Sequence, residues 1–122
     1  MIDHVTANVD DLDAAKVFYV EALAPLGYSV QMEIEGAAAG FGTGEGIPPF
    51  WISNREGRGA THVAFSAPDR ATVDAFYSAA MSAGASDNGA PGLRTELHEN
   101  YYGAFVHDAS GNNIEAVCHQ PG

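Results

Sequence analysis

Three residues of this sequence have side chains that commonly bind metal ions and lie in comparable settings: His4, His62 and Glu115. Each histidine opens a segment in which polar and apolar residues alternate, and Glu115 is enclosed by apolar residues near the end of the chain. A carboxylate in apolar surroundings is costly to bury unless a positive group meets it. A cation shared by the three side chains would remove that cost.

Two histidines and one carboxylate form a ligand set that suits Fe, Mn, Zn, Ni or Co. Three protein ligands also leave coordination positions open for a substrate. Taken singly, a histidine on a strand is more often structural or exposed than a ligand. Taken together, His4, His62 and Glu115 predict a divalent metal site.

Short patterns occur twice in the chain at one constant offset of about 58 positions. His4-Val5 aligns with His62-Val63, and Phe18-Tyr19 aligns with Phe76-Tyr77. Each copy opens with an alternating segment typical of a strand and continues with a helix whose apolar residues recur every three or four positions. Three short strand candidates follow in each copy. The repeat therefore predicts two βαβββ modules.

The predicted fold class is α+β, with the two modules in tandem within one domain, 1–122. Module one covers about 1–54, a connector covers 55–59, and module two covers about 60–119. One face of each sheet lies under its helix, and the free faces carry His4 and His62. If these faces meet, they enclose a cleft lined by both histidines.

Composition excludes several classes of partner. Sixteen acidic residues stand against five basic ones, which gives a net charge of −11. So acidic a surface repels nucleic acid and anionic lipid, and there is no apolar run long enough for a membrane span. No basic-then-apolar leader is present, and Cys118 is the single cysteine. A cytoplasmic protein with a small-molecule ligand is expected.

Three segments together resemble the vicinal oxygen chelate superfamily: His4-Val5, Thr61-His62-Val63-Ala64-Phe65, and the closing motif Asp108-x-x-Gly111-Asn112-Asn113-Ile114-Glu115. This group includes glyoxalase I, extradiol dioxygenases, and fosfomycin- and bleomycin-resistance proteins. The resemblance covers essentially the whole chain. It implies paired modules in a U-shaped mixed sheet around a cleft, helices on the outer face, a homodimer, and a metal at His4, His62 and Glu115.

The chain resembles glyoxalase I but departs from it in the number of metal ligands. Glyoxalase I has a fourth ligand, usually glutamate, on the last strand of its first half. Superposing 49–53 on 113–117 places Trp51 opposite Glu115, and no Glu, Gln or His lies between Gly46 and Ser53. A three-ligand site is therefore expected. Trp51 would form a flat apolar wall of the cleft.

The resemblance implies a metal-dependent lyase, isomerase or dioxygenase that acts on a small oxygenated molecule. Only one of Tyr101 and Tyr102 can face the cleft, because neighbours on a strand alternate. Tyr102 is predicted to shape the pocket. His98 is a candidate general acid or base, with a solvated loop histidine as the alternative reading.

Two other functions remain open. The first is a metal-free protein, similar to the bleomycin-resistance proteins, that binds a small aromatic ligand in the cleft. The second is a domain that keeps the fold for interaction alone.

Overall fold

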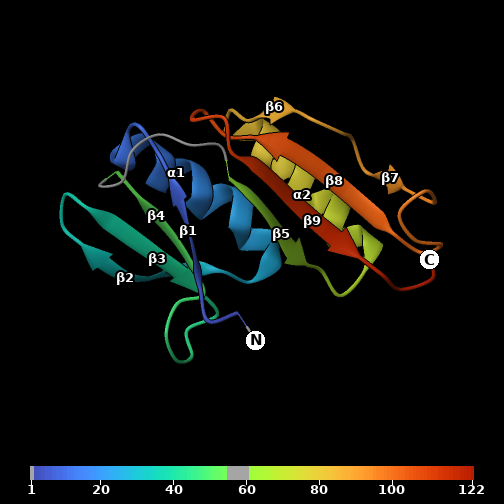
Figure 1. The fold of residues 1–122 in the computed structure, drawn as a ribbon, viewed down its shortest axis with the longest axis horizontal. Helices are drawn as coiled ribbons and strands as arrows, with labels where there is room; N and C mark the ends of the chain where they lie inside the picture. The colour runs from blue at the N-terminus through green and yellow to red at the C-terminus, as the bar shows by residue number, and fades with distance from the viewer. Residues whose placement is uncertain (1, 55–60) are drawn as a thin grey trace.

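A computed structural model of the chain describes residues 2–54 and 61–122. The predicted connector, 55–59, lies outside these ranges. Each of the two described parts contains one long helix and one sheet, as the repeat predicts (Figure 1).

The first module forms a four-stranded sheet in the order β1-β4-β3-β2. β1 runs parallel to β4, and the other neighbours are antiparallel. Its elements, in chain order, are β1 (Val5–Asn8), α1 (Leu12–Leu23), the short 3₁₀ helix η1 (Ala24–Leu26), β2 (Ser29–Ile34), β3 (Ala38–Gly42) and β4 (Phe50–Ser53).

The second module repeats this plan in the order β5-β9-β8-β6, with a further short strand, β7, also paired with β8. β5 is parallel to β9, as β1 is to β4. The elements are β5 (His62–Ser66), α2 (Arg70–Ser82), β6 (Ser86–Asp87), β7 (Gly92–Leu93), β8 (Tyr102–His107) and β9 (Asn113–Cys118). The predicted α+β fold of two βαβββ modules is confirmed. The strands form two separate hydrogen-bonded sheets, and the second module has β7 as an additional strand.

Both long helices begin in the same way. The Asp11 carboxylate accepts a hydrogen bond from the Ala14 amide at 3.0 Å, and the Asp69 carboxylate accepts one from the Thr72 amide at 2.8 Å. Such a cap satisfies an amide that has no partner within the helix. The two caps are 58 residues apart, so the sequence repeat is also a repeat of local structure.

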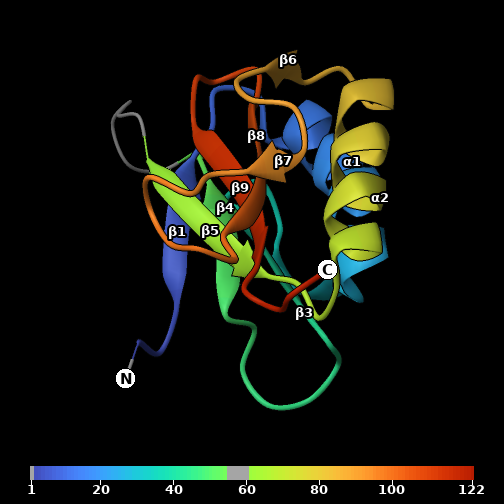
Figure 2. The same ribbon diagram turned by 90° about the vertical axis from the view of Figure 1, so that its right-hand side faces the viewer.

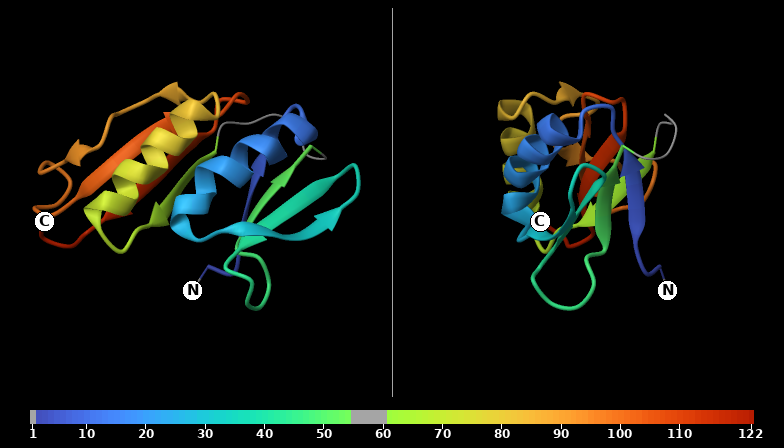
Figure 3. Two further views of the ribbon diagram at one scale, coloured as in Figure 1. Left: turned by 180° about the vertical axis from the view of Figure 1, so that it is seen from behind. Right: turned by 90° about the vertical axis from the view of Figure 1, so that its left-hand side faces the viewer.

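The helices α1 and α2 lie side by side on one side of the molecule, and the strands lie on the other (Figures 2 and 3). The core between them is shared by the two modules. Phe50 of β4 meets Phe65 of β5 edge-on, with ring centroids 5.1 Å apart. The faces of the two sheets that point away from this core remain available for function.

A buried polar cluster joins the modules at the β8–β9 turn. Asn112 is 0% exposed, and its amide group donates to the Asn8 carbonyl of β1 at 2.8 Å and to Asp108 at 2.9 Å. Its amide oxygen accepts from the Thr61 amide at 3.0 Å, just before β5. Tyr19 of α1 donates to Asp108 at 2.7 Å. One side chain thus contacts both modules and the turn.

Candidate functional site

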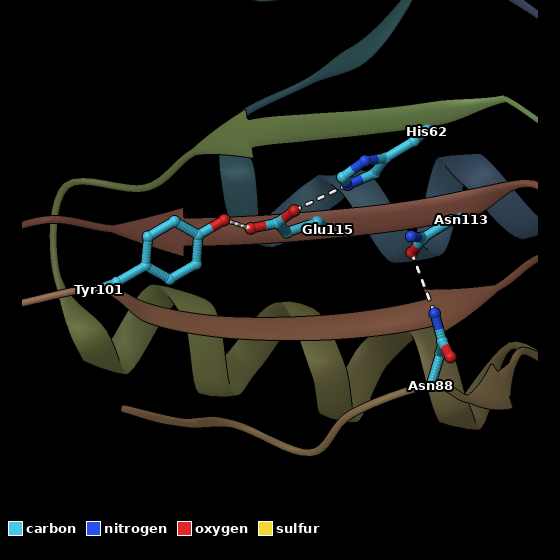
Figure 4. Close-up of polar contacts among 5 residues, drawn as sticks. All are labelled: His62, Asn88, Tyr101, Asn113 and Glu115. Atoms are coloured by element: carbon cyan, nitrogen blue, oxygen red, sulfur yellow. Dashed lines mark hydrogen bonds and ion pairs between the residues drawn. The ribbon is translucent and has the colours of Figure 1, made fainter. Parts of the chain in front are cut away.

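The centre of the candidate site is Glu115, a carboxylate that is only 1% exposed on β9. Nε2 of His62 lies 2.8 Å from its Oε1, and the Tyr101 hydroxyl donates to its Oε2 (Figure 4). Both carboxylate oxygens are therefore engaged on the free face of the second sheet. A buried carboxylate with two polar partners at its rim is the strongest chemical feature of this face.

Strand pairing explains why His62 and Glu115 meet. In the parallel pair of β5 and β9, His62 is opposite Asn113, and Ala64 is opposite Glu115. His62 and Ala64 are two positions apart, so both point to the same face as Glu115. The intervening Val63 is buried in the core. The alternation that the sequence predicts for this strand is present in the structure.

The structure assigns Tyr101, in place of the predicted Tyr102, to the candidate site. Tyr102 points to the helix side of β8, where its hydroxyl donates to Asp74 of α2 at 2.7 Å and its ring packs against Arg70. Tyr101 is one residue earlier and therefore occupies the Glu115 face. The predicted pocket position of Tyr102 is corrected accordingly.

The environment of Tyr101 raises the pKa of its phenol to about 12. Partial burial makes the largest contribution, followed by the hydrogen bond to Glu115 and the negative charge of that carboxylate, while Arg94 opposes the rise. Tyr101 is therefore a neutral hydrogen-bond donor at neutral pH.

Titration of Tyr101 gives a first testable prediction. In native protein, the difference in tyrosinate absorbance between the wild type and Tyr101→Phe is expected to have its midpoint near pH 12. Glu115→Gln should lower that midpoint, because it removes a negative charge that disfavours tyrosinate. The pKa of Tyr101 in the folded protein is above the ordinary value of 10.0. The contribution of Tyr101 to the stability of the folded state is therefore complete below pH 10 and is lost as pH rises through 12. An unchanged midpoint in Glu115→Gln would contradict the assigned contact.

Aromatic side chains surround the His62–Glu115 pair. Phe105 is opposite Glu115 across β8 and β9, and its ring centroid is 6.4 Å from that of His62. The His119 ring centroid is 5.2 Å from that of Tyr101, and the His98 ring centroid is 5.8 Å from that of His119. The rings of Tyr101, His119 and His98 are thus linked by two successive contacts, and the acid–base role of His98 stays a prediction.

Sequence reasoning missed Phe105 and His119, and it chose Tyr102 where it had also considered Tyr101. A usable signal existed for Phe105, because a tight turn between Asp108 and Gly111 sets the register of β8 and β9. That register places Phe105 opposite Glu115, and alternation then places Tyr101 on the same face.

His4 and Trp51 lie on the first module. Trp51 pairs with Thr6 of β1 and rests against Gly40, while its indole donates to the Pro48 carbonyl at 3.0 Å. His4 lies two residues before Thr6 and so extends the same free face. Its Nδ1 is 2.7 Å from the Asp3 carboxylate, and its side chain is 51% exposed.

The structure brings together two of the three predicted metal ligands. Within residues 2–54 and 61–122, no group of three His, Cys, Asp or Glu side chains is close enough to hold a metal ion. His62 and Glu115 are neighbours, whereas His4 lies on the other sheet. A single chain therefore presents His62 and Glu115 as a candidate two-ligand half-site and His4 as a separate histidine.

The half-site fits a divalent ion in its donor chemistry. Ligand atoms that each lie about 2.1 Å from one ion are about 3.0 Å apart at octahedral angles and about 3.4 Å apart at tetrahedral angles. The two donor atoms of His62 and Glu115 are 2.8 Å apart. Imidazole and carboxylate are also the donors that Zn, Fe and Ni accept. The pair could bind such an ion with little movement, but it needs further ligands.

Tandem βαβββ modules, each with a helix on one sheet face and polar side chains on the other, are the features by which the class of protein can be recognised. The chain belongs to the Glyoxalase/Bleomycin resistance protein/Dioxygenase superfamily, whose model matches residues 1–116. This confirms the resemblance that the sequence motifs predict. A comparison with curated proteins found no match.

Solved structures with the same fold cover nearly the whole chain. A glyoxalase/bleomycin resistance protein from Albidiferax ferrireducens is 25% identical with a TM-score of 0.80, and 98% of each chain is covered. A lactoylglutathione lyase from Agrobacterium tumefaciens is 20% identical with a TM-score of 0.72, covering 97% of this chain and 92% of that one. TioX from Micromonospora is 19% identical with a TM-score of 0.72, covering 98% and 99%.

The helices in the described part of the chain are too short or too polar to serve as membrane spans.

Proposed function

We propose that this protein is a metal-dependent lyase, isomerase or dioxygenase that acts on a small oxygenated molecule. His62 and Glu115 of one chain and His4 of a second copy would hold a divalent ion. The observation that carries the proposal is the buried Glu115 carboxylate with His62 Nε2 2.8 Å from its Oε1. A bound cation would compensate the negative charge of the buried carboxylate and would explain why it is placed there.

A homodimer is proposed because the ligands are divided between two sheet faces. A symmetric dimer that sets module one of one copy against module two of the other would form two equal sites. The face that carries His4 and Trp51 also exposes apolar side chains: Met32 is 49% and Ile34 is 48% exposed. Strand register puts both on the Trp51 face, where a second copy would cover them.

When bound, the ion would supply Lewis acidity to two adjacent substrate oxygens. The residues of the chain would do the rest. Tyr101, whose single hydroxyl proton is donated to Glu115, would accept a hydrogen bond from a substrate hydroxyl. Phe105 would provide an apolar floor, and Trp51 of the second copy would provide the opposite wall. His98 is proposed as a proton shuttle at the edge of the site.

The proposed location is the cytoplasm. Its support is that Cys118, the single cysteine, is a buried free thiol, as is common in a reducing compartment.

Metal content tests the proposal directly. Protein purified without chelator is expected to contain close to one divalent ion per chain, and His62→Ala is expected to contain almost none, because the variant loses one of three ligands. Elemental analysis of both proteins side by side makes the measurement. Iron or manganese would favour oxygen chemistry, and nickel or zinc would favour isomerisation. If the wild type holds no metal even after reconstitution with several divalent ions, the enzyme proposal fails.

A metal-free binding protein is the second candidate function. It is favoured by one observation: Glu115 already has hydrogen-bond partners for both oxygens, in His62 and Tyr101. Such a pair can persist as a buried polar network without an ion. This candidate predicts that replacing His4 leaves the affinity for a small aromatic ligand unchanged, whereas the enzyme proposal predicts joint loss of metal and activity.

A further inference from the structure

Arg94 is a cation on the same face of the second sheet as Glu115, and the proposed function leaves it without a role. Leu93 pairs with Tyr102, and the Arg94 amide donates to the Tyr101 carbonyl at 2.7 Å. Arg94 is therefore the cross-strand neighbour of Tyr101 and points to the same face. Its charge reaches that phenol, because it opposes the rise of the Tyr101 pKa.

The local sequence holds the Arg94 side chain in place. Its guanidinium carbon lies 5.5 Å from the centroid of the Phe105 ring, and Nη2 donates to the Ala90 carbonyl at 2.8 Å. Two glycines make room for it. A Cβ at Gly92 would lie 2.9 Å from Nη1, and one at Gly89 would lie 3.1 Å from Nη2. A long, flexible side chain is thus pre-positioned on an aromatic ring beside the candidate site.

The guanidinium keeps most of its hydrogen-bonding capacity free. Arginine has five N–H donors, and the Ala90 bond is the side-chain hydrogen bond that Arg94 makes within the described residues. None of the described carboxylates forms an ion pair with it. Arg94 therefore places a cation without a described carboxylate partner on the face of the candidate site. A ligand could supply the missing anion.

We infer that Arg94, held on Phe105, is the receptor for a carboxylate of the ligand, so that the ligand is a small organic acid. A single planar guanidinium matches one planar carboxylate in a two-point contact, whereas a dianionic phosphate in so acidic a protein would need more cations. This inference rests on the proposed function only in using the same site. It adds the ligand's class and a specificity-determining residue.

Phenylacetate and its neutral isostere phenylacetamide are suitable probes, because they differ in charge and hardly in shape. Both are titrated into the purified protein, and into protein stripped of metal by chelator, with NMR shifts as the readout. We expect phenylacetate to bind about tenfold more tightly or better in both forms, the usual range for a charge-assisted hydrogen bond. Arg94→Gln should abolish the preference and leave the amide's affinity unchanged, and Arg94→Lys should retain part of the preference.

Arg70→Gln is the matched control. The guanidinium carbon of Arg70 lies 5.1 Å from the centroid of the Tyr102 ring, on the face of β8 opposite to Phe105 and Arg94. It should keep the full preference for the acid. A preference that survives Arg94→Gln would show that another group binds the carboxylate, and a preference that disappears with the metal would show that the ion binds it. Either result would overturn the inference. Equal binding of acid and amide, or no binding of either, would also overturn it. Loss of the preference in Arg94→Gln in protein that never binds metal would support Arg94 while the metal proposal fails.

Discussion

A mixture of the variants His4→Ala and Glu115→Gln is expected to bind metal, although each variant alone should bind almost none. In a mixed dimer, one site combines both defects, and the other combines an intact His4 with an intact His62–Glu115 pair. Random association makes about half of the dimers mixed, so about a quarter of all sites should be restored. Elemental analysis after joint refolding of equal amounts gives the measurement.

The control for this experiment is a mixture of His62→Ala and Glu115→Gln. Both residues belong to the same half-site, so no mixed dimer contains an intact site and no metal should be recovered. If the first mixture recovers no more metal than the control mixture, the site is not shared between two copies in the proposed way. The same comparison carried out with activity would show whether the restored sites are catalytic.

Asn112→Ala is expected to destabilise the protein by about 3 to 5 kcal/mol, because it leaves several buried groups without partners. The Asn8 carbonyl and the Thr61 amide lose their bonds to the side chain, and Asp108 loses one donor. Domains of this size are commonly stable by about 5 to 15 kcal/mol. Chemical denaturation followed by circular dichroism would measure the change.

Asn88→Ala is the matched control for Asn112→Ala. The Asn88 side chain is exposed and makes one hydrogen bond with the described residues, to Asn113 at 3.2 Å (Figure 4). Its loss should cost about 0.5 kcal/mol or less, because water replaces the bond. If the two variants unfolded at similar denaturant concentrations, the polar cluster would not be the joint between the modules that we describe.

Much of the fold was predictable because its signals are local. The aspartates before both helices and the apolar spacing within them each depend on a few neighbouring residues. Repetition at one offset then made these signals stronger than either copy alone. The short strands β6 and β7 carried weaker signals, because two-residue strands have no periodicity to detect. The sequence predicts three strands after each helix, whereas the described residues after α2 form four.

The candidate site was predictable in part. His62 and Glu115 could be assigned to one face because alternation within a strand is a local property, and their strands occupy corresponding places in the repeat. The choice between Tyr101 and Tyr102 depended on which side of β8 faces α2, and alternation alone leaves both choices open. Their hydroxyl partners, Glu115 and Asp74, decide it in the structure.

The sequence by itself determined the two-module plan, the family and the chemical type of the candidate ligands, because all three are expressed in short motifs and their spacing. Only the tertiary structure decided that His62 and Glu115 form a pair without His4, that Tyr101 caps that pair, and that Arg94 lies on Phe105. These contacts join residues that are far apart in the chain or lie on different strands. Their geometry depends on strand register and on how the modules pack, and long-range packing sets both.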